Sequence, residues 1–217
     1  MLIGASPTSA GATTTFLGWS FGHLSPSTSI TGLDQSRYDH TMNISSGRTC
    51  GFAFTLAANT VYQTQYIYIT GHPTGTTWLT FGTDHQCTGH EWWFGGYGQS
   101  NTFHPLFTRA ISTGTQHSFF LYADMSGGTQ YWNWHVGSTS LYGPWAKSWK
   151  GDHVTAGLQS YYSGLFVVYH TYALYYQVND TGTWNSWSGT TKFTSGSPMC
   201  YRKTTTTVIY VGEYTSC

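Results

Sequence analysis

Short runs of aromatic and β-branched residues recur along the chain between clusters of Gly, Ser and Thr. This pattern predicts strands joined by turns. No stretch keeps a helical period of about 3.6 residues, and strong helix formers are scarce. The expected strands are Gly51–Ala58, Val61–Thr70, Thr76–Thr83, His90–Tyr97, Leu106–Ser112, Gln116–Asp124, Thr129–Val136, His153–Ser160, Leu165–Val178 and Thr204–Tyr214. We therefore expect an all-β protein.

Alternation is clearest between Tyr131 and Val136, where every second residue is apolar. Trp132 and Trp134 fall on one face of the expected strand, whereas Asn133 and His135 fall on the other. Only one of these faces can line a ligand groove, and the pattern leaves open which one. The strand Gln116–Asp124 is apolar on both faces, which predicts a central position in a sheet.

About ten strands without helices favour a single antiparallel β-sandwich of the jelly-roll kind, with a barrel as the alternative. We expect this domain to span residues 16–217. Residues 1–15 read as a flexible leader or the remnant of a signal peptide, because small residues around Ala10-x-Ala12 follow a short apolar start. The second interpretation predicts a secreted, extracellular protein.

The chain has few charges and many rings: 7% of its residues are charged and 18% are aromatic. Binding to nucleic acid depends on clusters of Lys and Arg, and none is present. No apolar run reaches the roughly 20 residues of a membrane span. A neutral surface rich in hydroxyl groups suits a neutral polysaccharide or glycan, or copies of the same chain.

Four cysteines, Cys50, Cys87, Cys200 and Cys217, occur without a Cys-x-x-Cys motif. Zinc-ribbon and thioredoxin interpretations therefore fail. Four cysteines allow three pairings. We favour two disulfides, Cys50–Cys87 and Cys200–Cys217, because each closes a modest loop, and two disulfides would indicate an oxidising compartment.

A family resemblance lies in the middle of the chain. Residues Ile111–Tyr122 form a Gly-led turn and a hydrophobic strand, and Tyr131–Gly137 form a Trp-rich strand that ends in Val-Gly. Gly151–Gly157 shows the same pattern of a short apolar and polar run bounded by glycines. This arrangement resembles the concanavalin-like lectin and glucanase sandwich, and the related sandwich of secreted glutamic peptidases. The clustered acids of the glucanases, Glu-x-Asp-x-x-Glu, are absent.

The densest group of functional residue types lies between Asp84 and Gly98. Trp92, Trp93 and Tyr97 can form a flat platform for sugar rings, and adjacent strand residues face opposite ways, so one tryptophan can be core. With these three residues we group Trp132, Trp134 and His135 as candidate ligand-binding residues. The alternative is a core strand capped by a disulfide-held turn.

Metal binding is a second interpretation of the same segment. Asp84, His85 and His90 are residue types that bind zinc, but no His-x-His or His-Glu-x-x-His spacing is present. Calcium prefers several carboxylates, and the chain has eight acidic residues in all. We expect no cofactor, with calcium or zinc as the alternatives.

Glu91 and Glu213 are the only glutamates. Retaining glycosidases hold two carboxyl groups about 5–5.5 Å apart and inverting ones about 6.5–9.5 Å apart, so the pair is a candidate catalytic set. The resemblance to glutamic peptidases implies a glutamate that activates water beside a second polar residue, commonly glutamine. Glu91, in an aromatic strand, resembles their catalytic glutamate, and Gln63, Gln65 and Gln159 are available partners.

Three functions follow from the sequence. The first is a secreted, non-catalytic sandwich that binds neutral carbohydrate through exposed aromatic residues. The second is a self-assembling subunit of an extracellular filament or coat. The third is a secreted hydrolase, a glycosidase or a glutamic-peptidase-like enzyme, that uses Glu91.

Overall fold

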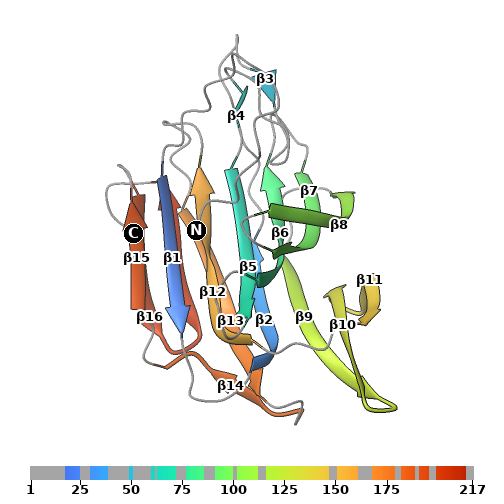
Figure 1. Ribbon diagram of the computed structural model, residues 1–217. Helices are drawn as coiled ribbons and strands as arrows, with labels where there is room; N and C mark the ends of the chain where they lie inside the picture. Colours follow the sequence, from blue (N-terminus) through green and yellow to red (C-terminus); the bar gives the residue numbers. More distant parts are fainter. Residues whose placement is uncertain are drawn as a thin grey trace.

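The computed structural model describes residues 18–24, 30–38, 49–50, 60–61, 63–71, 77–85, 91–99, 102–111, 116–146, 151–160, 168–178, 182–188, 191–195 and 199–213. These residues form strands and turns, and no helix (Figure 1). The strands are β1 (Gly18–Leu24), β2 (Ile30–Tyr38), β3 (Thr49–Cys50), β4 (Thr60–Val61), β5 (Gln63–Gly71), β6 (Thr77–His85), β7 (Glu91–Gln99), β8 (Thr102–Ile111), β9 (Gln116–Ser126), β10 (Thr129–Val136), β11 (Thr139–Ala146), β12 (Gly151–Ser160), β13 (Val168–Val178), β14 (Trp184–Ser186), β15 (Thr191–Ser195), β16 (Met199–Thr205) and β17 (Val208–Glu213). The all-β prediction is confirmed.

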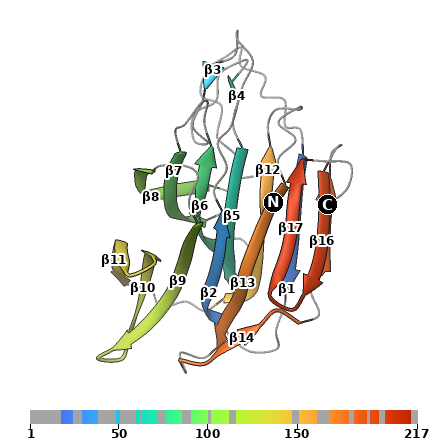
Figure 2. The ribbon, with the colours of Figure 1, turned by 180° about the vertical axis from the view of Figure 1, so that it is seen from behind.

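The strands form two packed layers. Layer A has the order β15-β1-β12-β5-β6-β7-β8, and layer B has the order β16-β17-β13-β2-β9-β10-β11, with β14 beside β13. Among the described residues, one register pair, Gly151 with Ile30, joins the layers. The described pairings within the layers are antiparallel, and the short pair β3–β4 is parallel. Figure 2 shows the reverse side, where β13, β17 and β16 lie in front.

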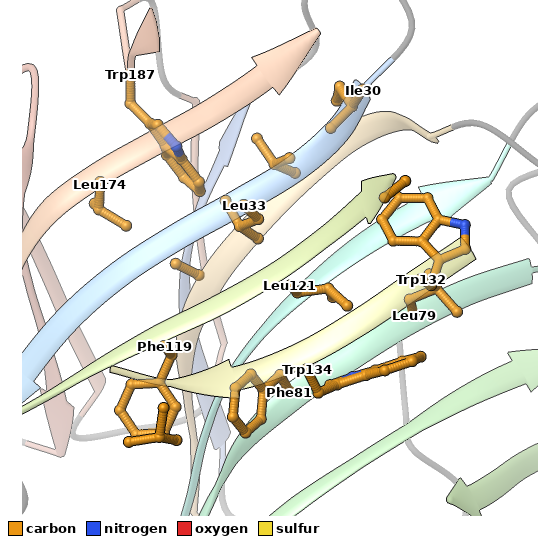
Figure 3. Packing of buried hydrophobic residues seen from close by; sticks show 14 of the residues in the cluster. Ile30, Leu33, Leu79, Phe81, Phe119, Leu121, Trp132, Trp134, Leu174 and Trp187 are labelled. Carbon is orange, nitrogen blue, oxygen red and sulfur yellow. The ribbon is translucent and has the colours of Figure 1, made fainter. Parts of the chain in front are cut away.

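Large apolar side chains fill the space between the layers (Figure 3). Phe81 of β6 meets Phe119 of β9 edge to face, with ring centroids 5.0 Å apart. Leu79 and Val154 from layer A and Leu121 from layer B have no exposed surface. Burial of apolar area at about 25 cal/mol per Å² makes this core the main favourable contribution to folding.

The tryptophans of β10 belong to this core. Trp132 and Trp134 are each 0% exposed, and the Nε1 atom of Trp134 donates to the carbonyl oxygen of Thr80, 2.9 Å away. The prediction that they bind ligand is therefore wrong: a ring enclosed on both sides offers no face to a sugar. Tyr131, Asn133 and His135 lie on the outward face instead.

Glycines on β7 make room for rings from neighbouring strands. A Cβ added at Gly98 would lie 1.9 Å from the Trp78 ring, and one at Gly95 would lie 2.2 Å from the Phe107 ring. Tyr97 of the same strand stacks on Trp145 of β11 at 5.0 Å, which brings the β7–β8 end of layer A against the β11 edge of layer B.

Most expected strands agree with the structure within a few residues, and Thr129–Val136 agrees at both ends. The expected strand Thr204–Tyr214 is wrong, because a turn at Thr206 and Thr207 separates β16 from β17. The pattern also missed β1, β2, β3, β11, β14, β15 and most of β16. The expected strand at 51–58 and the leader at 1–15 lie outside the described residues.

Candidate functional site

A row of polar residues crosses one end of layer A. Gln63 of β5 is opposite His85 of β6, and His85 is opposite Glu91 of β7. On the other side of β5, Ser160 of β12 is opposite Gln63. Directly opposite residues of antiparallel strands share a face, so the row Ser160–Gln63–His85–Glu91 occupies one face of the layer. We call it the polar row.

The face of the polar row is fixed by Trp93, which lies two residues after Glu91 and so on the same side of β7. The Trp93 ring meets His117 at 4.9 Å and Phe119 at 6.3 Å, and both belong to β9 in layer B. The polar row therefore lies on the face of layer A that is directed toward layer B, at the end nearest β3 and β4 (Figure 1).

The next row occupies the opposite face of layer A. Gln159, Thr64, Asp84 and Trp92 follow one another across β12, β5, β6 and β7. Trp92 and Trp93 thus face opposite ways, as expected for neighbours in a strand. Among the candidate glutamines, Gln159 does not share a face with Glu91, whereas Gln63 and Gln65 do.

Glu91 and Glu213 lie on strands of different layers. Glu213 ends β17, which packs against β1 and β12, and β7 is three strands beyond β12 in layer A. At about 4.8 Å per strand, this order separates the two backbone positions by about 14 Å along the sheet. The glycosidase spacings apply to carboxyl groups, and the two side chains lie outside the described part, so the two-carboxylate site stays a prediction.

The predicted metal-binding residues are divided in a similar way. Asp84 and His85 are consecutive residues of β6 and face opposite sides of layer A. His90 lies outside the described residues. Within the described part of the chain, no group of three His, Cys, Asp or Glu side chains is placed to hold a metal ion.

Cys200 of β16 is buried. It is opposite Gly212 of β17, five residues before Cys217. Cys87 and Cys217 lie outside the described residues, as does the side chain of Cys50. The two pairings therefore stay predictions.

Tyr97, the third residue of the expected aromatic platform, is engaged by the protein's own rings. Its ring stacks on His104 at 4.7 Å and on Trp145 at 5.0 Å, with interplanar angles of 16° and 25°. The stack links β7 and β8 to β11. Tyr97 therefore joins the two layers.

A second polar cluster lies on the outward face of layer B. The Tyr122 hydroxyl is 3.3 Å from Nε2 of His135, and the Asn133 amide donates to the Asp124 carboxylate at 3.1 Å. Partial burial lowers the pKa of His135, and the nearby Asp124 charge partly offsets this. Burial, and then the same charge, raise the pKa of Tyr122. Of this cluster, the sequence identified His135 alone as a candidate ligand-binding residue. Its neighbours Tyr122 and Asp124 could be found only from the register between β9 and β10.

The two layers form an antiparallel β-sandwich. Solved structures with the same kind of sandwich show which fold the chain shares. The chain is similar to scytalido-glutamic peptidase bound to a peptide-based transition-state analogue, with a TM-score of 0.58 and 12% identity. A structure of scytalido-glutamic peptidase with a transition-state analogue inhibitor has a TM-score of 0.59 and 10% sequence identity. SCP-B, a member of the eqolisin family of peptidases, bound to a tripeptide, has a TM-score of 0.56 and 11% sequence identity. Each match covers 89% of this chain and 97% of the other.

The resemblance to the sandwich of glutamic peptidases is thus confirmed at the level of the fold. No protein-family model and no curated protein sequence matches the chain. The described residues contain no helix of the length and hydropathy that crossing a membrane requires.

Proposed function

We propose that the chain is a secreted peptide-bond hydrolase in which Glu91 acts as the general base. The observation that carries the proposal is the position of Glu91 in the polar row of a glutamic-peptidase-like sandwich. A glutamate-dependent enzyme on this chain must use Glu91 or Glu213, because there are no others. Only Glu91 lies in a row with an imidazole and an amide, since Glu213 is opposite Met199.

The polar row supplies the groups that hydrolysis of an amide requires. The carboxylate of Glu91 takes a proton from water, and the water oxygen attacks the carbonyl carbon of the peptide. The Gln63 amide donates a hydrogen bond to the oxygen that becomes negative. The proton passes from Glu91 to the departing nitrogen as the carbon–nitrogen bond breaks, which leaves an acid and an amine.

His85 lies between Gln63 and Glu91 in the row. An imidazole directly across from a carboxylate can donate a hydrogen bond to it, and His85 is therefore the residue that would orient Glu91.

The test is digestion of an unfolded protein followed by mass spectrometry, with Glu91→Gln and Glu213→Gln as a matched pair. We expect Glu91→Gln to lose about 100-fold or more of the rate, the usual contribution of a general base. Glu213→Gln should retain the parent rate. Equal rates for Glu91→Gln and the parent, or no hydrolysis by the parent at any pH, would refute the proposal.

A further inference from the structure

We propose that the outward face of layer B carries a binding band for neutral polysaccharide. The outer band consists of two register rows that cross β14, β13, β2, β9 and β10, the first of them reaching β11. The first row is Ser186, Tyr175, Asp34, Phe120, His135 and Ser140, and the second is Trp184, Gln177, Gly32, Tyr122 and Asn133. This site does not use Glu91 and does not depend on the proposed hydrolysis.

The direction of the band follows from its neighbours along each strand. Phe119 and Leu121 of β9 lie in the core with no exposed surface, so Phe120 and Tyr122 between them face outward. Leu33 of β2 is likewise buried, which turns Gly32 and Asp34 to the outer side. Residues of β13 and β10 that are directly opposite these positions lie on the same outward face.

Trp184 gives the band a ring whose edge lies over Gly32. A Cβ added at Gly32 would lie 2.9 Å from Cη2 of Trp184, 3.0 Å from Cβ of Gln177 and 3.3 Å from Cβ of Tyr122. The far edge of the indole therefore lies over the bare backbone of Gly32, and the side chain remains half-buried. A partly exposed aromatic ring held in place by its neighbours can pack against the apolar face of a sugar ring.

Hydrogen-bonding groups lie between the rings. The Tyr122 hydroxyl is within reach of His135. Asn133 is buried, and its amide donates to the Asp124 carboxylate and the Tyr131 carbonyl, so the exposed group of this pair is Asp124 at the rim of the band. These contacts fix the orientation of donors and acceptors before a ligand arrives, which reduces the entropy lost on binding. The hydroxyl groups of a sugar can donate and accept, so they match a surface that offers both.

Charge selects the chemical class of the ligand. The band and its rim contain two carboxylates, Asp34 and Asp124, and neither row contains Lys or Arg. An anionic polymer would be repelled, and nucleic acid would find no counterion to release. A protein partner would favour an apolar centre, whereas the one exposed large hydrophobic side chain in the described part, Met125, lies outside both rows. A neutral polyol is the ligand that remains.

The dimensions suit an extended chain. The first row crosses six strands, which at about 4.8 Å per step is about 24 Å. This length accommodates several linked sugar units. Rings at Tyr175, Phe120 and Trp184 are separated by polar groups, so successive units can stack and hydrogen-bond in alternation.

The test is sedimentation of the purified full chain with cellulose, chitin, starch granules and an insoluble β-1,3-glucan, beside a tube without polymer. We expect one or more of the polymers to pellet the protein, and Trp184→Ala to weaken that binding about tenfold. Gly32→Ala leaves the ring present but displaces it, and should weaken binding less. Tyr210→Ala removes a half-buried ring that holds Arg202 outside the band and should bind like the parent.

Three results would overturn the band: no polymer pelleting the parent, Trp184→Ala binding like the parent, or equal pelleting in the tube without polymer, which indicates self-association. Circular dichroism shows whether each variant is folded. If Trp184→Ala does not fold, Tyr175→Ala replaces it with the same expected loss. Glu91→Gln should pellet like the parent, so failure of hydrolysis and failure of binding are distinguishable.

Discussion

The two faces of β10 carry residues of similar size with opposite consequences. Trp132 and Trp134 point inward and have no exposed surface, whereas Tyr131 and His135 remain half-buried on the outside. The inner pair contributes to folding, because its area is removed from water and packed against the other layer. The outer residues contribute little to folding and are available for recognition. An aromatic-rich strand is therefore informative about ligand binding only after its faces have been assigned.

The largest expected effect follows from emptying the inner face. Trp134→Ala removes a fully buried ring and its hydrogen bond to Thr80, and should lower the free energy of unfolding by about 3–5 kcal/mol. His135→Ala, on the outer face of the same strand, should cost less than about 1 kcal/mol. Urea denaturation of both variants measures the difference. Similar costs for the two substitutions would contradict the assignment of faces.

Adding side-chain atoms at a glycine should lower stability where the space is already filled and have little effect where it is open. Gly98→Ala places a methyl group where the Trp78 ring already lies, and should cost about 1–3 kcal/mol. Gly127→Asn is the control: Gly127 has a φ of +57° and open space around its Cβ position. Asn tolerates that conformation, so less than about 1 kcal/mol should be lost. Denaturation midpoints compare the two, and a larger loss at Gly127 would argue against close packing on β7.

Removing the buried hydroxyl group of Tyr201 should increase the stability of the protein. The Tyr201 hydroxyl has no hydrogen-bond partner among the described residues, and burial raises its pKa to about 12. Tyr201→Phe should therefore raise the free energy of unfolding by about 1 kcal/mol at neutral pH.

Tyr201 also predicts the sign of an alkaline effect. The unfolded chain loses the phenolic proton near pH 10 and the folded chain near pH 12, so this group's contribution is present below pH 10 and is lost as pH rises toward 12. Tyr201→Phe should lack that part of the alkaline loss. Unfolding curves at several alkaline pH values measure it, and parallel losses in both proteins would contradict the prediction.

The smallest expected effect concerns the outer face in acid. The pKa of His135 is lowered by burial, so the unfolded state binds more protons as pH falls below 6.5 and the contribution of His135 to stability is lost there. Asp124 opposes the lowering, and Asp124→Asn should therefore lower the pKa of His135 further. An NMR titration of the histidine ring measures this directly, and an upward shift in Asp124→Asn would be incompatible with the geometry.

The sequence could predict features that depend on neighbours in the chain. The bounds of β10 and the central place of β9 both follow from local alternation of apolar and polar residues. The face of β10 could not be predicted, since Trp, Tyr and Asn each occur on both kinds of surface. β2 was missed because its polar residues, such as Asp34 and Gln35, hide the alternation.

The candidate sites depended on pairings between distant segments. Gln63 and Glu91 come into one row because β6 lies between their strands. Tyr175 and His135 come into one row through β2 and β9. Strand order of this kind is set by packing of the whole core. The alternation of residues within one strand does not reveal which other strands lie beside it.

Hydroxyl-radical footprinting of the native protein, read residue by residue by mass spectrometry, tests the assignment of the two faces most directly. The account predicts that Trp132 and Trp134 remain unoxidised until the protein is unfolded, while Trp184 and His135 are modified in the native state. Oxidation of Trp132 and Trp134 in the native protein at the rate of Trp184 would contradict it.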